Sequence, residues 1–576
     1  MFGYEFVTLD EDQKHARRKL LEFYPVIAQW SALAILALFQ LFFFVSWLAK
    51  RGLDYERPRS PSLIKRKDGK RTWLGSFQQT CEQARWWLKK PVIRDWGTRA
   101  EWIAGAVWTF WLLSLCVVQT GDGLDYLHLT KRFGIIAASQ LPLHYLLAMR
   151  SPYSPVQLLT RMSHEELKAA HMVLGRIVFF LFVLHGIFYM NYFVLSGFLA
   201  KRIKDKDVIF GITALVSFWA LNTTALGRLR SWNYRVFYVS HVAIATLIVV
   251  PLFLHVTHIR LYVYEIFVVY AVHVVLRSLS LDVYSGSISV LPGTNLIRIR
   301  IPLTGKHSAL KWKPGQHVYL SRPSGKSYST LYDQFVLRNK TNPFTIASIP
   351  SKDQELVLVA RTLNGNTKHL AQLARSLTMA GSDDVATIPL GLEGPYGASA
   401  RLPDFARFDK ILLIAGGVGA TFVMPIYRSI LEAGDSSHPL RFIWATRKLS
   451  ETQWAFPMVD DDEPAMESPT HAVEVFVTQP VGPDLQVSEA AEDVELAEDD
   501  QLLSMEEQME KPRRGVLLRA GRPQIRAIID EECSKASKVA VIACGPKAIT
   551  TTVSDSVERW VSRGLDVYWH DETFGW

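Results

Sequence analysis

Cysteine is scarce in this chain of 576 residues, and its few copies form no recognisable pattern. The four cysteines are Cys81, Cys116, Cys533 and Cys544, and none has the spacing of a disulfide framework or of a zinc site. A nucleic-acid-binding module is also missing, and the net charge of +9 comes largely from one basic loop. We therefore expect no disulfide scaffold, no structural zinc and no nucleic acid partner, and the lipid surface is the simplest partner for the basic charge.

Long apolar runs are missing after about Ser280, whereas they crowd the first half of the chain. With their flanks, these runs reach the about 20 residues that a membrane-spanning helix needs. The pattern predicts a helical membrane bundle followed by a soluble module. The seven runs are Val26–Ala49, Trp102–Val118, Phe133–Met149, Met172–Phe198, Val208–Leu226, Val236–Leu254 and Leu261–Leu276.

The charge pattern predicts the orientation in the membrane. The first run is longer than the apolar region of a signal peptide, and Lys50 and Arg51 follow it instead of a cleavage site. Between Lys50 and Arg94 there are 13 Lys/Arg and 4 Asp/Glu, which places this loop in the cytosol. Alternating spans then place the soluble half in the cytosol as well, although the loop Lys201–Lys206 falls outside against the rule. A count of six spans, with the first run as an optional anchor, is the alternative.

Two apolar runs carry a histidine at each end with identical spacing. "HMVLGRIVFFLFVLH" extends from His171 to His185, and "HVAIATLIVVPLFLH" extends from His241 to His255. Fourteen positions are almost four helical turns, so both histidines of a run lie within about 40° of one face and about 21 Å apart. One span separates the two runs, which makes them parallel, with His171 level with His241 and His185 level with His255. This arrangement predicts two stacked haems, each bound by two imidazoles; four interfacial histidines are the alternative.

Other residues of these spans have no partner at the same spacing. His144, His258 and His273 lie in or beside spans, and we interpret them as bystanders. Gly175, one turn after His171, would let a flat macrocycle approach the backbone, or it serves ordinary helix packing.

The second half alternates short strands with Gly and Pro turns, which predicts a small β-barrel. "ILLIAGGVGATFVMPI" (Ile411–Ile426) then indicates a buried strand, a glycine-rich turn and a helix start, which together suit a pyrophosphate. "RFIWATR" and "VAVIACGP" (Val539–Pro546) follow as strands whose carboxyl ends would line a nucleotide crevice. Between Pro480 and Glu510 there are eleven acidic residues and no Lys or Arg, which predicts a disordered, solvated insertion.

We therefore predict a multi-domain protein with an all-α membrane bundle, a β-barrel and an α/β nucleotide-binding domain. The expected segments are a polar tail (1–24), a first span (25–49), a basic loop (50–96), a haem-binding bundle (97–278), the barrel (280–400) and the nucleotide-binding domain (401–576) with its acidic insertion (about 458–514).

The order of these motifs resembles the ferric reductase and NADPH oxidase superfamily. The paired histidines are followed by PGQH, NPFT, GPYG, GGVGAT, CGP and a terminal DETFGW. Within the superfamily, residues from about 95 to 576 look most like the fungal transmembrane metalloreductases. The resemblance implies a ferredoxin-reductase-like arrangement of the barrel and the nucleotide-binding domain.

The resemblance also implies roles for individual residues. The haem ligands would be His171, His185, His241 and His255; the FAD contacts Asn342, Pro343, Phe344, Thr345, Thr367, Lys368 and Trp576; and the NADPH contacts Gly416, Gly417, Gly419, Thr421, Arg447, Cys544, Gly545 and Pro546. Members of the family usually have histidine where Asn342 stands. Asparagine can donate a hydrogen bond but carries no charge, so flavin affinity is the property that this departure affects.

The implied function is electron transfer from NADPH through FAD and two b-type haems to ferric or cupric chelates across the membrane. The same path could deliver electrons to oxygen and produce superoxide. The short outer loops, about Thr120–Lys131 and Ala200–Asp207, carry no metal-binding cluster, which favours oxygen or a loosely held chelate. A third hypothesis is a catalytically silent membrane scaffold that signals through its acidic insertion. Both the plasma membrane and the endoplasmic reticulum suit a chain with no visible retention or lipidation motif.

Overall fold

The computed structural model of the chain describes residues 4–54, 73–92, 97–120, 124–303, 311–321, 341–363, 366–379, 387–397, 402–433, 439–456, 471–479 and 516–572. The chain divides into two compact units, with the boundary between Leu279 and Ser280. Trp576 lies outside the described residues, and so does most of the predicted acidic insertion (about 458–514). The expected bounds of the insertion are too wide, because His471–Val477 within them form a strand of the parallel sheet.

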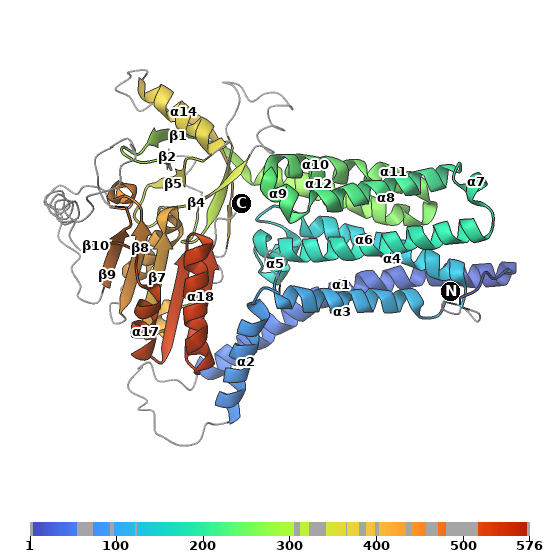
Figure 1. Cartoon of the computed structure of the whole chain (residues 1–576), viewed down its shortest axis with the longest axis horizontal. Helices are drawn as coiled ribbons and strands as arrows, with labels where there is room; N and C mark the ends of the chain where they lie inside the picture. The colour runs from blue at the N-terminus through green and yellow to red at the C-terminus, as the bar shows by residue number, and fades with distance from the viewer. Residues whose placement is uncertain are drawn as a thin grey trace, which may run out of the picture. The chain divides into compact units, whose positions relative to one another are not determined.

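The first unit is all helical (Figure 1). Its helices are α1 (Glu11–Asp54), α2 (Trp73–Lys89), α3 (Arg99–Val117), α4 (Tyr126–Leu147), α5 (Pro155–Thr160), α6 (His164–Leu195), α7 (Leu199–Arg202), α8 (Lys206–Thr224), α9 (Gly227–Trp232), α10 (Tyr234–Leu247), α11 (Val249–His255) and α12 (Arg260–Leu279), with the 3-10 helix η1 (Thr257–Ile259) before α12. Polar side chains fix several helix starts: Asp125 accepts from the amides of Leu127 and His128, and Ser163 and Glu166 form a capping box.

Six stretches of helix in the described part of the chain are long and apolar enough to cross a membrane: Glu11–Leu48, Arg99–Val117, His164–Leu195, Lys206–Thr224, Val236–His255 and Thr257–Leu279. The seventh expected span, Phe133–Met149, is present as α4 but is not among these six. Helix α4 is nevertheless the most buried helix of the bundle core, and α1, α6 and α12 all pack against it. The expectation of a helical membrane bundle is therefore confirmed, with α4 as its polar central member.

Helix α1 is an integral part of the bundle and begins earlier than the polar tail predicts. It starts at Glu11, and Arg17 forms an ion pair with Asp125 at 2.9 Å between largely buried side chains. Further along α1, Gln29 Nε2 donates to Glu265 Oε2 of α12 at 2.7 Å. Because polar partners are scarce within a membrane, such bonds fix the position of the helix against its neighbours.

The second run of paired histidines is interrupted near its middle. Helix α10 ends at Leu247 and α11 begins at Val249, although the two together form one stretch of membrane-spanning length. Pro251 explains the break, because it has no N–H for the carbonyl one turn earlier and its ring crowds that carbonyl. The histidines His241 and His255 therefore lie on two consecutive helices.

The second unit begins with a six-stranded antiparallel barrel. Its strands are β1 (Leu281–Val290), β2 (Leu296–Pro302), β3 (His317–Ser321), β4 (Asn342–Thr345), β5 (Glu355–Arg361) and β6 (Ile388–Tyr396), in the order β4-β3-β6-β1-β2-β5. The two ends of this order meet, because Ile346 pairs with Leu358 and the Ala347 amide donates to the Val357 carbonyl at 2.8 Å. Helix α14 (Asn366–Met379) adds Leu370, Ala371 and Ala374 to the barrel core.

The rest of the second unit is a parallel sheet of six strands with helices. The strands are β7 (Lys410–Gly416), β8 (Leu440–Thr446), β9 (His471–Val477), β10 (Val516–Ala520), β11 (Lys538–Cys544) and β12 (Asp566–Glu572), and the helices are α15 (Ala420–Glu432), α17 (Ile525–Ser534) and α18 (Lys547–Ser562), with 3-10 helices η4 (Phe405–Arg407), η5 (Gly417–Gly419) and η6 (Leu449–Thr452). The strand order is β10-β9-β8-β7-β11-β12, so the direction of winding reverses between β7 and β11. The predicted fold class is thereby confirmed.

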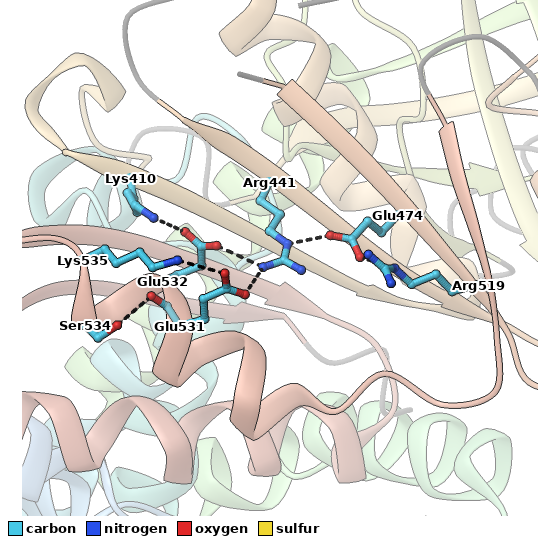
Figure 2. A network of polar contacts seen from close by, with 8 residues as sticks. All are labelled: Lys410, Arg441, Glu474, Arg519, Glu531, Glu532, Ser534 and Lys535. Carbon is cyan, nitrogen blue, oxygen red and sulfur yellow. Dashed lines mark hydrogen bonds and ion pairs between the residues drawn. The ribbon is translucent and has the colours of Figure 1, made fainter. Parts of the chain in front are cut away.

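A network of ion pairs joins α17 to this sheet (Figure 2). Arg441 lies at its centre and contacts Glu474 at 2.6 Å, Glu532 at 3.0 Å and Glu531 at 3.1 Å. Lys410 contacts Glu532 at 2.6 Å. Lys410 begins β7, and Arg441 is the second residue of β8, so the network lies at the amino ends of both strands. It is therefore away from the carboxyl ends, where α/β sheets bind ligands. We interpret it as a structural clamp.

Candidate functional site

The structure brings the four histidines of the paired runs together across neighbouring helices. In the first pair, His171 and His241, the ring centres lie 6.4 Å apart and the ring planes cross at 71°. In the second pair, His185 and His255, the ring centres also lie 6.4 Å apart, and the planes cross at 89°. The pairing joins α6 to α10 and α11 at two levels of the bundle.

This spacing fits one iron atom between the two imidazoles of each pair. A metal-bound imidazole nitrogen lies about 2 Å from the metal and about 1 Å from its own ring centre, so two opposed rings would have centres about 6 Å apart. The observed 6.4 Å matches that value at both levels. Each pair of imidazoles could therefore hold one haem iron between its two rings.

Backbone carbonyls of adjacent helices orient the histidines. On α4, the Thr130 carbonyl accepts from His185 Nδ1 at 2.8 Å, and the His144 carbonyl accepts from His171 Nδ1 at 3.0 Å. On α8, the Asp207 carbonyl accepts from His255 Nδ1 at 2.6 Å. Metal-bound histidine usually donates its other ring N–H in this way, which leaves Nε2 free to bind the metal.

The fourth histidine repeats the pattern less closely. The His241 ring lies near the backbone of Leu221 on α8, but its Nδ1 completes no hydrogen bond among the described residues. Thr130 and His144 are 14 positions apart, and so are Asp207 and Leu221. The supporting helices α4 and α8 therefore present carbonyls at the same interval as the histidines they face.

Two glycines let the second pair approach these helices closely. A Cβ on Gly134 would lie 2.6 Å from His185 Nδ1, and a Cβ on Gly211 would lie 2.6 Å from His255 Cε1. Each glycine stands four positions after the carbonyl that the same histidine bonds, namely Thr130 and Asp207. Small side chains one turn after the acceptor are a signal that sequence reasoning could have used.

The first pair has a different neighbour, which the sequence analysis interpreted as a bystander. The ring of His144 stacks on His171 with centres 3.9 Å apart and planes within 8°. Gly175 makes room for this ring, because a Cβ there would lie 2.8 Å from His144 Cε1. The close approach at Gly175 therefore belongs to His144. His258 and His273 lie in η1 and α12, outside both pairs.

In the second unit, the glycine-rich turn lies at the reversal of the strand order. Gly416 ends β7, and the short helix η5 (Gly417–Gly419) leads into α15. The turn Cys544–Pro546 ends β11, the neighbouring strand on the other side of the reversal. Ligands of open α/β sheets bind in the crevice at this point, so the predicted nucleotide residues meet where such a site is expected.

Packing between the two turns explains part of the glycine pattern. A Cβ on Gly419 would overlap the carbonyl of Cys544, with its carbon only 2.6 Å away, and a Cβ on Gly416 would lie 2.7 Å from Pro546 Cδ. Gly545 faces Gly416 at a similarly short distance. Gly417 differs, because it has a φ of +55° and a Cβ there would meet only Arg361 Nη2, at 3.5 Å. Of the loop glycines, Gly417 is the one positioned to face a ligand.

Two side chains support this loop, and a third, Arg447, lies at the same edge of the sheet. The buried Trp444 of β8 donates from Nε1 to the Gly417 carbonyl at 3.0 Å. The buried Thr421 donates to the Val418 carbonyl at 2.9 Å, so its hydroxyl serves the helix start. Arg447 is exposed directly after β8, at the same edge of the sheet, which suits contact with a 2′-phosphate.

Arg361, at the end of β5, was not selected by sequence reasoning. Its guanidinium lies beside Gly417 and 3.4 Å from Glu451, and its Nε is buried without a hydrogen-bond partner among the described residues. A buried unpaired guanidinium nitrogen beside a glycine turn suits an anion such as a nucleotide phosphate. The barrel thus contributes a cation to the crevice.

The predicted FAD residues lie on β4 and at the start of α14. Asn366 Nδ2 donates to Asn342 Oδ1 at 3.1 Å, and Thr367 Oγ1 accepts from the Leu363 amide at 3.0 Å. Lys368 follows in the first turn of α14. Phe344 and Thr345 are buried, and Phe344 belongs to the barrel core, whereas Asn342 and Pro343 are half-buried. The accessible part of this strand is therefore its first two residues.

Burial also determines the state of the cysteine in the crevice. The Cys544 side chain is fully buried, which raises the pKa of its thiol well above the ordinary value, and Glu572 and Asp571 raise it further. A neutral thiol is neither a nucleophile nor a metal ligand at physiological pH. Cys544 therefore contributes to the turn through packing alone.

Together these observations define a multi-pass membrane protein that carries an FAD-binding barrel and a nicotinamide-nucleotide-binding domain. Comparison with known families agrees: residues 133–252 match "Ferric reductase like transmembrane component", residues 280–400 match "FAD-binding domain", and residues 408–558 match "Ferric reductase NAD binding domain". The chain belongs to the ferric reductase family and is an oxidoreductase.

Known relatives are distant in sequence. A probable cell surface ferric reductase of Aspergillus oryzae is 26% identical over 57% of this chain and 44% of its own length. A probable metalloreductase of Scheffersomyces stipitis is 24% identical over 67% of each chain. Among solved structures, the ferredoxin reductase in carbazole 1,9a-dioxygenase is similar to 50% of this chain and 69% of its own, with 13% identity and a TM-score of 0.30.

Proposed function

We propose that this protein passes electrons from NADPH through FAD and two b-type haems across the membrane to a ferric or cupric chelate. The observation that carries the proposal is the presence of two histidine pairs at two levels of one bundle, each with ring centres 6.4 Å apart. The relatives described as ferric reductase and metalloreductase favour a metal chelate as the acceptor.

Each group would have its own residues. FAD would be held by Asn342 and Pro343 with the start of α14, and it would supply the conversion of a two-electron hydride donor into single electrons. Haem held by the histidine pairs would accept single electrons. NADPH would lie at the crevice between β7 and β11, against Gly417. Arg447 and Arg361 would supply positive charge to its phosphates.

The chain contributes position and potential. The carbonyls of Thr130, His144 and Asp207 fix the orientation of the imidazoles through hydrogen bonds to their Nδ1 atoms. Likewise, Trp444 fixes the Gly417 carbonyl and with it the backbone of the glycine turn, whose amides would face a phosphate. This preorganisation lowers the cost of ordering the sites when their ligands bind.

The test is anaerobic reduction of the purified full-length protein by NADPH, followed through the haem absorbance. A ferric chelate and oxygen are then added in separate runs. Faster reoxidation by the chelate supports the metalloreductase, and faster reoxidation by oxygen indicates an oxidase instead. Absence of any haem absorbance would refute the proposal and favour the scaffold hypothesis.

Two variants locate the path. His255→Ala should abolish haem binding at the second pair. The haem at the first pair should stay reducible by NADPH, since His171 and His241 are unchanged. His258→Ala is the matched control, because His258 lies outside both pairs, and it should behave as the wild type. Equal haem loss in both variants would contradict the assignment.

A further inference from the structure

The two histidine pairs are supported by different kinds of contact. In the second pair, His185 and His255 lie directly on the backbone of neighbouring helices, at Gly134 and Gly211. In the first pair, the ring of His144 on α4 packs against Gly175 and stacks on His171, both of which belong to α6. In this pair, a side chain from a neighbouring helix therefore covers the face of one imidazole.

His144 contacts His171 with both its backbone and its ring. Its carbonyl accepts the Nδ1 proton of His171 at 3.0 Å, which fixes one edge of the imidazole. Its ring covers the face of the same imidazole, with centres 3.9 Å apart and planes 8° from parallel. An edge contact alone would still let the ring pivot about the hydrogen bond, whereas a face contact prevents that rotation.

The hydrogen bonding of His144 itself does not explain its place. Its Nδ1 is buried without a partner among the described residues, which costs free energy relative to an apolar side chain. The space it fills exists only because residue 175 has no side chain. The flat contact with His171 is the interaction that accounts for both features.

We propose that His144 is a positioning residue that sets the plane of the His171 imidazole and thereby the electronic character of the haem bound by the first pair. The inference rests on the proposed haem function. It deepens that function by separating a pair adjusted by a side chain from a pair fixed by backbone. The orientation of axial imidazoles is one of the means by which a protein tunes a haem.

The observed angles supply the readout. The planes of the first pair cross at 71° and those of the second at 89°. Because low-spin ferric haem spectra depend on the angle between the axial imidazole planes, the wild type should give two distinct electron paramagnetic resonance signals. Rotation of His171 alone should move one signal and leave the other in place.

The experiment compares variants of the full-length protein in the oxidised state by electron paramagnetic resonance and by redox titration. His144→Leu fills the space without a flat face, so we expect one signal and one midpoint potential to shift. Both variants keep the backbone carbonyl of residue 144, and His144→Phe also keeps a flat face. We therefore expect both signals of His144→Phe to stay near those of the wild type. His258→Ala, outside both pairs, should change neither.

The outcomes separate the two proposals. Wild-type signals and potentials in His144→Leu would overturn the positioning role, and so would equal shifts in His144→Leu and His144→Phe. A wild-type protein without low-spin ferric haem would refute the proposed function instead. Gly134→Ala provides the reciprocal case, because its Cβ would press on His185, and it should shift the signal that His144→Leu leaves unchanged.

Discussion

Gly419→Ala should disable the nucleotide crevice through a steric clash. Its Cβ would lie 2.6 Å from the carbonyl carbon of Cys544, whereas carbon atoms in contact are separated by about 3.5–4.0 Å. The two turns must therefore move apart by about 1 Å, and both neighbouring atoms belong to the backbone, which yields little. Overpacking of this kind costs about 1–3 kcal/mol in stability.

The effect on NADPH follows from the same displacement. A shift of about 1 Å in a positioning element can cost about 100-fold in reactivity, so we expect kcat/KM for NADPH to fall by roughly that factor. Flavin bleaching by NADPH, measured anaerobically by stopped flow across NADPH concentrations, gives this ratio for the full-length protein. Thermal unfolding of the same preparation measures the loss of stability.

Gly521→Ala is the matched control. Gly521 has a φ of +85°, and a Cβ there would meet nothing within 4 Å, so the variant bears backbone strain of about 1–2 kcal/mol without a clash. We expect lowered stability with unchanged use of NADPH. Wild-type kinetics in Gly419→Ala, or an equal kinetic loss in Gly521→Ala, would refute the packing argument.

Three further predictions concern the second unit and the exposed thiol. In the native protein, a maleimide should label the exposed Cys81 and spare Cys544, whose buried thiol has a raised pKa; labelling of both at similar rates would contradict the burial. Arg447→Ala should raise KM for NADPH about 10-fold and leave NADH use unchanged, as measured by flavin reduction, because only NADPH has a 2′-phosphate; equal effects on both nucleotides would remove Arg447 from that role. The pKa of Glu531 is lowered by hydrogen bonds from Lys535 and Arg441. Its stabilising effect is therefore present above the unfolded pKa and is lost as pH falls through the folded one. Thermal unfolding should separate wild type from Glu531→Gln near pH 6, and the difference should shrink as pH falls below about 4.3, the ordinary pKa of glutamate, and vanish below the lowered folded pKa.

Periodicity made much of the fold predictable from sequence. Apolar runs located the membrane helices, and alternation located the barrel strands. The run Phe133–Met149 located α4 as well, although Lys131, Arg132 and His144 lower the hydropathy of this helix and its start at Tyr126 was missed. The prediction of a polar tail at residues 1–24 was wrong, because α1 begins at Glu11. Its polar residue Arg17 pairs with Asp125, so a polar segment here belongs to the bundle.

The candidate site was predictable only in its side chains. The 14-residue interval identifies His171 and His185, since a helix places such residues on one face. The supporting carbonyls of Thr130 and Asp207 left only an indirect trace, the glycine four positions after each, because every residue carries a carbonyl and only the fold selects two of them. Gly417 was likewise indistinguishable from Gly419 until the packing of the Cys544 turn separated clash from open space.

The use of main-chain acceptors for the histidine N–H groups bears on how this protein tolerates change. A substitution at Thr130, Asp207 or Leu221 replaces a side chain and leaves the carbonyl where it was, so scanning these positions one by one would miss their contribution. A one-residue deletion between Thr130 and His144, by contrast, rotates one acceptor by about 100° relative to the other. Only one of the two could then still face its imidazole. Length within these helices is therefore under tighter constraint than composition, because a change in length preserves the acceptor at one level of the bundle only by displacing the acceptor at the other.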